Sequence, residues 1–267
     1  MSRFSLNQAT TKHWPLPALA AGCAEAGVTG VGLWREDVGA YGVRKAAVLM
    51  RDHGLTVTSL CRSGFFAEPG WRDENRRAIE EAATVGAPVL VLVSGGLPAG
   101  SRDIDAARAH VGEAVGALVP EAQAAGVRLA IEPLHPMYAS DRCVVSTLRQ
   151  ALDLAEPHPA DAVGVCVDTY HLWWDEDVWA QIARAGRQDR IACFQVADWL
   201  TPLPAGVLLG RGLPGTGCVQ LRRFREAVDA AGYTGPIEVE VFNEAVWSRP
   251  GPEVLAEAVA GVRDHVL

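Results

Sequence analysis

The sequence predicts an α/β fold, a single-domain (β/α)₈ barrel, on three observations. Eight short apolar segments alternate with eight segments of helical character, an order that implies parallel βαβ units. The chain of 267 residues is close to the length typical of one such barrel. No long polar linker divides it. We therefore expect one domain over residues 1–267.

The first four units each read as a strand followed by a helix. Gly27, Gly54 and Gly86 follow three of the helices, because glycine readily adopts the left-handed conformation that ends a helix. The third strand is rich in β-branched residues, and the fourth closes on a Ser-Gly-Gly turn. The expected strands are 4–9, 30–36, 56–61 and 88–93, and the expected helices are 16–26, 43–53, 72–85 and 104–125.

The second half repeats this rhythm. Its strands are short runs dominated by Val, Ile and Ala. The longest interruption is the loop 199–219, whose GRGLPGTG core suits neither helix nor strand, and long loops in compact domains usually serve function. The expected strands are 127–131, 163–167, 191–194 and 237–241, and the expected helices are 147–155, 178–185, 221–231 and 252–266.

Each strand of the second half ends at a polar residue: Glu132, Asp168, Gln195 or Glu240. Side chains alternate along a strand, and barrel active sites lie at the carboxyl ends of the strands, so these four should converge. A single acid of this kind could equally pair with an arginine or cap a helix. Three gathered carboxylates repel one another, and a divalent cation relieves this. With the amide oxygen of Gln195, the set suits Mn²⁺ or Mg²⁺ better than Zn²⁺.

Two histidines and two arginines are candidates for binding substrate. His171 follows Asp168 by three residues and could contact a substrate hydroxyl or transfer a proton. His135, in the EPLHP segment, has a similar but weaker claim. Arg211 in the long loop offers a fixed cation, and Arg62 ends an earlier strand. The competing interpretation is a loop histidine without a special role and solvated arginines.

Five of the eight tryptophans follow strand ends. Their rings could stack on a sugar or an aromatic group of the substrate, which makes Trp34 and Trp174 further substrate-binding candidates. They could equally form a subunit interface and make the protein a homo-oligomer. The five are Trp34, Trp173, Trp174, Trp199 and Trp247.

A buried ionic or hydrogen-bonded pair is also expected near the barrel floor, between Glu238 and Arg128. Glu238 precedes Glu240 by two residues and Arg128 precedes Glu132 by four, so both should point into the barrel. Neither side chain is expected to be buried alone.

Composition excludes several classes of function. With 24 basic and 32 acidic residues, the net charge of −8 disfavours nucleic acid as a partner. No apolar run approaches the roughly 20 residues of a membrane span, and no signal peptide is read. Six dispersed cysteines without a C-x-x-C motif suggest reduced thiols, so we expect a cytoplasmic protein.

Neither a phosphate-binding loop nor a G-x-S-x-G motif occurs. Scarce lysine and the lack of an obvious arginine clamp favour unphosphorylated substrates.

Taken together, the motifs IEP, DTYH, FQVADW, RGLPGTG and IEVEVFN resemble the xylose isomerase-like barrel superfamily, in its sugar phosphate isomerase/epimerase branch. The resemblance covers nearly the whole chain. It implies one divalent metal held by Glu132, Asp168, Gln195 and Glu240, with His171 and Arg211 contacting substrate. Many relatives carry His at the position of Gln195, and an amide oxygen is a weaker ligand than imidazole. Because the donor set is all oxygen, we expect Mn²⁺ first, with Mg²⁺, Co²⁺ and Zn²⁺ as alternatives.

The leading hypothesis is a metal-dependent isomerase or epimerase of a keto-sugar or cyclitol. Glu132 and Glu240 would move the proton next to the carbonyl, assisted by His171. A lyase using the same enolate, of the dehydratase or carbon–glycoside-cleaving type, is the runner-up, and the tryptophans mildly favour it. A barrel subunit without catalysis is a third interpretation, with Gln195 as its sign. An endonuclease of the superfamily is disfavoured by the acidic charge and the few histidines near the site.

Overall fold

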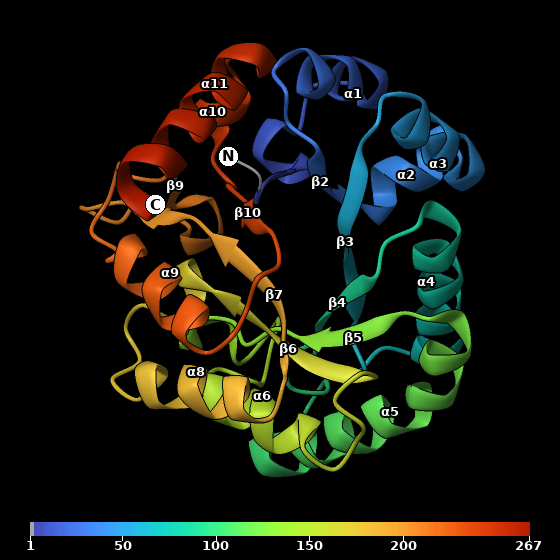
Figure 1. The fold of residues 1–267 in the computed structure, drawn as a ribbon. Coiled ribbons are helices and arrows are strands. Elements are labelled where there is room, and N and C mark those ends of the chain that lie inside the picture. The colour runs from blue at the N-terminus through green and yellow to red at the C-terminus, as the bar shows by residue number, and fades with distance from the viewer. Residues whose placement is uncertain (1–2) are drawn as a thin grey trace.

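The computed structural model describes residues 3–267, and eight parallel strands close into a barrel with helices around its outside (Figure 1). Around the barrel the strands follow the order β1-β10-β7-β6-β5-β4-β3-β2. The (β/α)₈ prediction is therefore confirmed. The barrel strands are β1 (Phe4–Asn7), β2 (Gly30–Trp34), β3 (Thr56–Gly64), β4 (Val89–Val93), β5 (Arg128–Ile131), β6 (Val163–Asp168), β7 (Ile191–Val196) and β10 (Ile237–Val239).

The helices form the outer ring, and all eight of the expected helical segments are helical. Shorter helices that the sequence patterns did not reveal follow several strand ends. The α-helices are α1 (Leu16–Glu25), α2 (Arg35–Tyr41), α3 (Val43–Asp52), α4 (Trp71–Val85), α5 (Ile104–Ala125), α6 (Leu148–Ala155), α7 (Thr169–Leu172), α8 (Val178–Arg187), α9 (Leu221–Ala230), α10 (Glu244–Trp247) and α11 (Gly251–Gly261), with the short turns η1 (Gln8–Thr11), η2 (Pro136–Tyr138), η3 (Val207–Leu209) and η4 (Val262–Val266).

Three strands end earlier than predicted: β10 ends at Val239, and β1 and β2 end where a helical turn begins at once. The Asn7 side chain accepts a hydrogen bond from the Ala9 N–H and so starts the turn η1. At the end of β2, Arg35 begins α2, and two acidic residues in its first turn suit the positive end of the helix dipole. The predicted strand extensions to residues 9 and 36 are therefore wrong, and both short elements lie at the mouth of the barrel.

The core has two parts. A large apolar cluster fills the space between the barrel and the helices. Inside the barrel, a small cluster of Val89, Ala130, Cys166 and Cys193 packs below the polar side chains. Five cysteines are buried as free thiols and Cys218 is exposed. Among the described helices, none has the length and hydropathy that a membrane crossing requires.

The loop 199–219 contains a short hairpin that was not expected. Strand β8 (Asp198–Trp199) pairs antiparallel with β9 (Arg211–Gly212). The Asp198 carboxylate accepts hydrogen bonds from the backbone N–H groups of Gly215 and Val219 at 3.0 and 2.9 Å, which closes the base of the loop. This hairpin continues directly from β7 and carries Arg211 back over the barrel mouth.

Candidate active site

Strands β5, β6 and β10 bring Glu132, Asp168 and Glu240 to the barrel mouth. All three side chains are buried, with exposed fractions of 5%, 0% and 3%. Glu132, Asp168 and His171 each offer a ligand atom, and these atoms lie within 4.8 Å of one another. The convergence predicted from the strand ends is therefore present.

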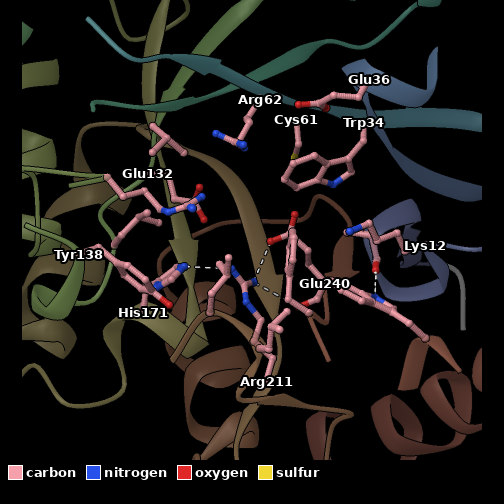
Figure 2. A pocket seen from close by; sticks show the side chains of 18 of the residues that line it. Lys12, Trp34, Glu36, Cys61, Arg62, Glu132, Tyr138, His171, Arg211 and Glu240 are labelled. Atoms are coloured by element: carbon pink, nitrogen blue, oxygen red, sulfur yellow. Dashed lines mark hydrogen bonds and ion pairs between the residues drawn. The ribbon is translucent and has the colours of Figure 1, made fainter. Parts of the chain in front are cut away.

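Arg211 occupies the space between the acids. Its Nη1 donates to Asp168 Oδ2 at 3.1 Å and to Glu240 Oε2 at 2.8 Å, and its Nη2 lies 3.0 Å from His171 Nε2 (Figure 2). The guanidinium thereby compensates part of the negative charge in the mouth. Its guanidinium group also lies over the rings of Tyr170 and Phe242, 5.0 and 4.8 Å from their centres.

The buried acids hold their protons more strongly than ordinary carboxyl groups. Burial, together with the charges of Glu240 and Asp168, raises the pKa of Glu132 well above its usual value. Burial also raises the pKa of Asp168, against the opposing charge of Arg211. Burial raises the pKa of Glu240 to about 7, although Arg211 acts in the opposite direction. The single positive charge of Arg211 therefore does not neutralise three carboxylates, and a further cation at this site would be stabilised.

His171 is an uncharged group in this environment. Burial first, and then the charge of Arg211, lower the pKa of its imidazole well below the usual value. Its Nδ1 lies 3.2 Å from the backbone N–H of His135, while Nε2 faces Arg211. A neutral imidazole accepts a hydrogen bond at one nitrogen only. His171 can therefore accept a hydrogen bond from only one of these donors, and its other nitrogen carries the N–H.

Gln195 on β7 is in register with Asp168 on β6 and with Glu238 on β10. Its Nε2 donates to Glu238 Oε1 at 2.9 Å, while among residues 3–267 only the Cys166 thiol donates to its Oε1, at 3.3 Å. A thiol is a weak donor, so the amide oxygen stays open to a stronger partner. The expected role of Gln195 as a metal ligand remains a prediction.

The predicted pairing of Glu238 with Arg128 is wrong. Uncharged donors from β1, β3 and β7 surround Glu238: Asn7 at 2.8 Å, Thr58 at 2.7 Å, Ser59 at 2.9 Å and Gln195 at 2.9 Å. Gly32 leaves the space for this carboxylate, since a Cβ there would lie 2.6 Å from it.

The separation of the two charges follows from strand geometry. Arg128 stands four residues before Glu132, about 13 Å along a strand, whereas Glu238 stands two residues before Glu240, about 7 Å. The arginine therefore lies deeper, where its Nη2 donates to the Asp189 carbonyl.

A pocket of about 420 Å³ opens above these groups. Six of the predicted residues line it: Trp34, Arg62, Glu132, His171, Arg211 and Glu240. Figure 2 shows Arg62 facing the pocket between Glu132 and Trp34, on the side opposite Arg211. Asp168 and Gln195 are covered by the lining residues rather than part of it.

His135 and Trp174 do not line this pocket. They pack against each other with ring centres 5.7 Å apart, and Trp174 donates its Nε1–H to the His171 carbonyl at 2.7 Å. Their predicted contact with substrate is not supported by this arrangement. Both residues instead hydrogen-bond to His171, His135 through its backbone N–H and Trp174 through its indole N–H.

The tryptophans divide into two groups. Trp34 and Trp247 line the pocket, whereas Trp173 and Trp199 pack together beside Tyr170. The stacking interpretation therefore fits only part of the set, and the interface interpretation stays a prediction.

Sequence reasoning missed several lining residues, among them Lys12, Tyr138, Arg142 and Phe242. None of them ends a strand in the pattern that we followed. Phe242 was within reach, since it follows Glu240 by two residues and so continues the same alternation. Tyr138 ends the short turn η2 and Arg142 lies in the loop after it, where no periodicity indicates the direction of a side chain.

A divalent metal fits the donor set. Glu132 Oε1 is buried and has no hydrogen-bond partner among the described residues. Carboxylate oxygens, an open amide oxygen and a neutral imidazole are the ligand types that Mn²⁺, Mg²⁺, Co²⁺ and Zn²⁺ accept. An orphaned buried carboxylate oxygen is costly, and a bound cation would satisfy it.

Comparison with known proteins agrees with this fold. The protein SMc04130 from Sinorhizobium meliloti is 45% identical, with a TM-score of 0.95 over 99% of this chain and 98% of that one. The IOLI protein with a bound zinc atom is 20% identical, with a TM-score of 0.83 over 99% and 98% of the two chains. The latter similarity shows the fold alone.

Two curated relatives match parts of the chain. An inosose isomerase from Halalkalibacterium halodurans is 26% identical over 137 residues, which are 50% of this chain and 46% of the relative. A 3-dehydroshikimate dehydratase from Pseudomonas aeruginosa is 34% identical over 125 residues, 45% of this chain and 19% of the relative. The matches thus span less than half of each relative. A family sequence model covers residues 20–265. The chain therefore belongs to the xylose isomerase-like TIM barrel family.

Proposed function

We propose that the pocket holds one divalent metal ion, Mn²⁺ first, and that the protein isomerises or epimerises a keto-sugar or cyclitol. The observation that carries the proposal is the placement of two buried carboxylates on one pocket. Glu132 and Glu240 both line it, and β6 and β7 lie between their strands in the barrel. Two such groups flanking a bound substrate can remove a proton and return it at another position or on another face.

The proposed ligands are Glu132, Asp168, Glu240 and the amide oxygen of Gln195, with the His171 ring as an additional donor. When bound, the ion supplies Lewis-acid polarisation of a carbonyl group. The unpaired Oε1 of Glu132 supports this assignment. The weak contact of the Gln195 oxygen supports it as well.

The chain's own residues would do the rest. Glu240 or Glu132 takes the proton from the carbon next to the carbonyl, and the other carboxyl group returns one to the enediolate. Neutral His171 exchanges hydrogen bonds with a substrate hydroxyl group. Trp34, Trp247, Leu208 and Leu209 line the same pocket and would supply apolar contacts to the C–H side of a sugar.

A solvent-deuterium experiment tests the base. Purified Mn²⁺-loaded protein is incubated in D₂O with inosose, D-psicose or 3-dehydroshikimate, and deuterium uptake is read by mass spectrometry. Glu240→Gln is expected to abolish uptake that the wild type shows, whereas Glu80→Gln, on the exposed face of α4, leaves it unchanged. Uptake retained by Glu240→Gln removes this residue as an essential base.

Calorimetric titration with MnCl₂ tests the metal. We expect one ion per chain, and lost binding in Asp168→Asn. A wild-type protein without stoichiometric metal would favour the interpretation as a non-catalytic subunit.

A dehydratase is the second candidate, favoured by the 34% identity to 3-dehydroshikimate dehydratase. It would begin with the same proton removal and then expel a hydroxyl group as water. Product masses separate the two candidates, because isomerisation conserves mass and dehydration loses one water.

A further inference from the structure

Two arginines of the pocket have no hydrogen-bond or ion-pair partner within the described part of the chain. Arg62 comes from β3, and Arg142 from the loop between η2 and α6, and both line the main pocket and a second hollow of about 460 Å³ beside it. Across residues 3–267, no hydrogen bond or ion pair holds either guanidinium group. Arg211, by contrast, forms ion pairs with Asp168 and Glu240.

Arg62 is held in place while its N–H groups stay free. Its guanidinium lies 5.5 Å from the ring centre of Trp34 and 4.6 Å from that of Phe65. Stacking of this kind orients the planar group without using its five hydrogen-bond donors. Burial lowers the pKa of Arg62, Glu36 raises it, and the nearby charge of Arg142 lowers it again. Because arginine keeps its proton in proteins, this half-buried group favours an anion as its partner.

A third donor faces the same pocket. Tyr138 lines it, and its hydroxyl group is buried without a hydrogen-bond partner among the described residues. The backbone N–H of Arg142 donates to the Tyr138 carbonyl at 2.9 Å, so one turn carries both side chains. An unsatisfied buried hydroxyl is as costly as a lost hydrogen bond. Its natural complement here is an acceptor brought by the ligand.

We propose that Arg62, Arg142 and Tyr138 form an oxyanion subsite, so that the substrate carries a carboxylate or phosphate group besides its carbonyl and hydroxyl groups. The proposal rests on the proposed function for the chemistry at the acids, and adds the class of substrate. The two arginines lie 80 residues apart in the sequence. This separation explains why no clamp is evident in the sequence.

Binding of matched cyclic polyols tests the proposal. Quinate carries a carboxylate, myo-inositol 1-phosphate carries a phosphate, and myo-inositol carries neither. Titration calorimetry on the metal-loaded and the metal-stripped protein is expected to show at least one anion binding about 10-fold or more tightly than myo-inositol, and the preferred anion identifies the group. Equal affinities, or no binding of either anion, overturn the proposal.

Variants connect the binding to these residues. Arg62→Gln and Arg142→Gln are each expected to weaken binding of the preferred anion about 10- to 100-fold, the range for a charge-assisted hydrogen bond. Tyr138→Phe should weaken it less while the protein keeps its thermal midpoint, since the hydroxyl makes no internal hydrogen bond. Arg187→Gln, at the exposed end of α8, is the control. Unchanged anion affinity in all three variants overturns the proposal.

The outcome is separable from that of the proposed function. Manganese binding that depends on Asp168, without anion preference, keeps the metal site and refutes the subsite. Anion binding that depends on the arginines, without manganese binding, keeps the subsite and refutes the metal site.

Discussion

Replacing Glu240 by Gln should change how the stability of the metal-stripped protein depends on pH. Burial raises the pKa of this carboxyl group from 4.5 to about 7 in the folded chain. Between these values the folded protein holds a proton that the unfolded chain has already lost. The proton therefore stabilises the folded state at low pH, and this contribution is lost as the pH rises through 7.

The magnitude follows from the same two values. Each unit of difference in pKa between the folded and unfolded states corresponds to about 1.4 kcal/mol, so the total is about 3 kcal/mol. Glutamine at position 240 has no proton to lose. Relative to wild type, Glu240→Gln should thus gain about 3 kcal/mol in the free energy of unfolding between pH 4 and pH 8.

Urea unfolding in the presence of EDTA, followed by tryptophan fluorescence at several pH values, measures this difference. Glu80→Gln, an exposed acid on α4, should give a curve parallel to wild type. Parallel curves for Glu240→Gln as well would show that the carboxyl group titrates as an ordinary one, and would refute the electrostatic reasoning for the site.

Three further predictions concern stability and accessibility. Arg211→Leu should destabilise the metal-stripped protein by about 3–5 kcal/mol in urea unfolding, since Asp168 and Glu240 lose their shared cation, and a loss below 1 kcal/mol would contradict this. Glu238→Gln should cost about 1–3 kcal/mol in the same assay, because an amide N–H would face donors where an oxygen now accepts, and an unchanged urea midpoint would count against that network. A disulfide reagent should modify Cys218 in the native protein and the five buried thiols only after unfolding, and rapid reaction of more than one native thiol would contradict the burial.

The strand ends were predictable because two simple regularities act together. Parallel strands share one carboxyl edge, and side chains alternate along each strand, so Glu132, Asp168 and Glu240 had to meet if the barrel closed. The ends of α1, α3 and α4 were predictable because Gly27, Gly54 and Gly86 follow them with a positive φ.

Other parts of the site depend on contacts that no local pattern encodes. The bridging position of Arg211 follows from the β8–β9 hairpin, whose pairing joins segments separated by a loop. The partners of Glu238 come from three strands, and its depth relative to Arg128 depends on the stagger of the barrel. Tyr138 and Arg142 reach the pocket through an irregular turn.

The hairpin at the mouth divides the long loop into two regions with different tolerance to change. Its base is fixed by strand pairing and by the Asp198 carboxylate, so Arg211 keeps its place whatever the tip does. The tip, residues 201–206, is largely exposed. Insertions and exchanges at the tip can therefore accumulate without disturbing the charged centre, while Leu208 and Leu209 next to it line the pocket. In such a loop, the sequence of the tip can change during evolution while Arg211 and the acids keep their arrangement.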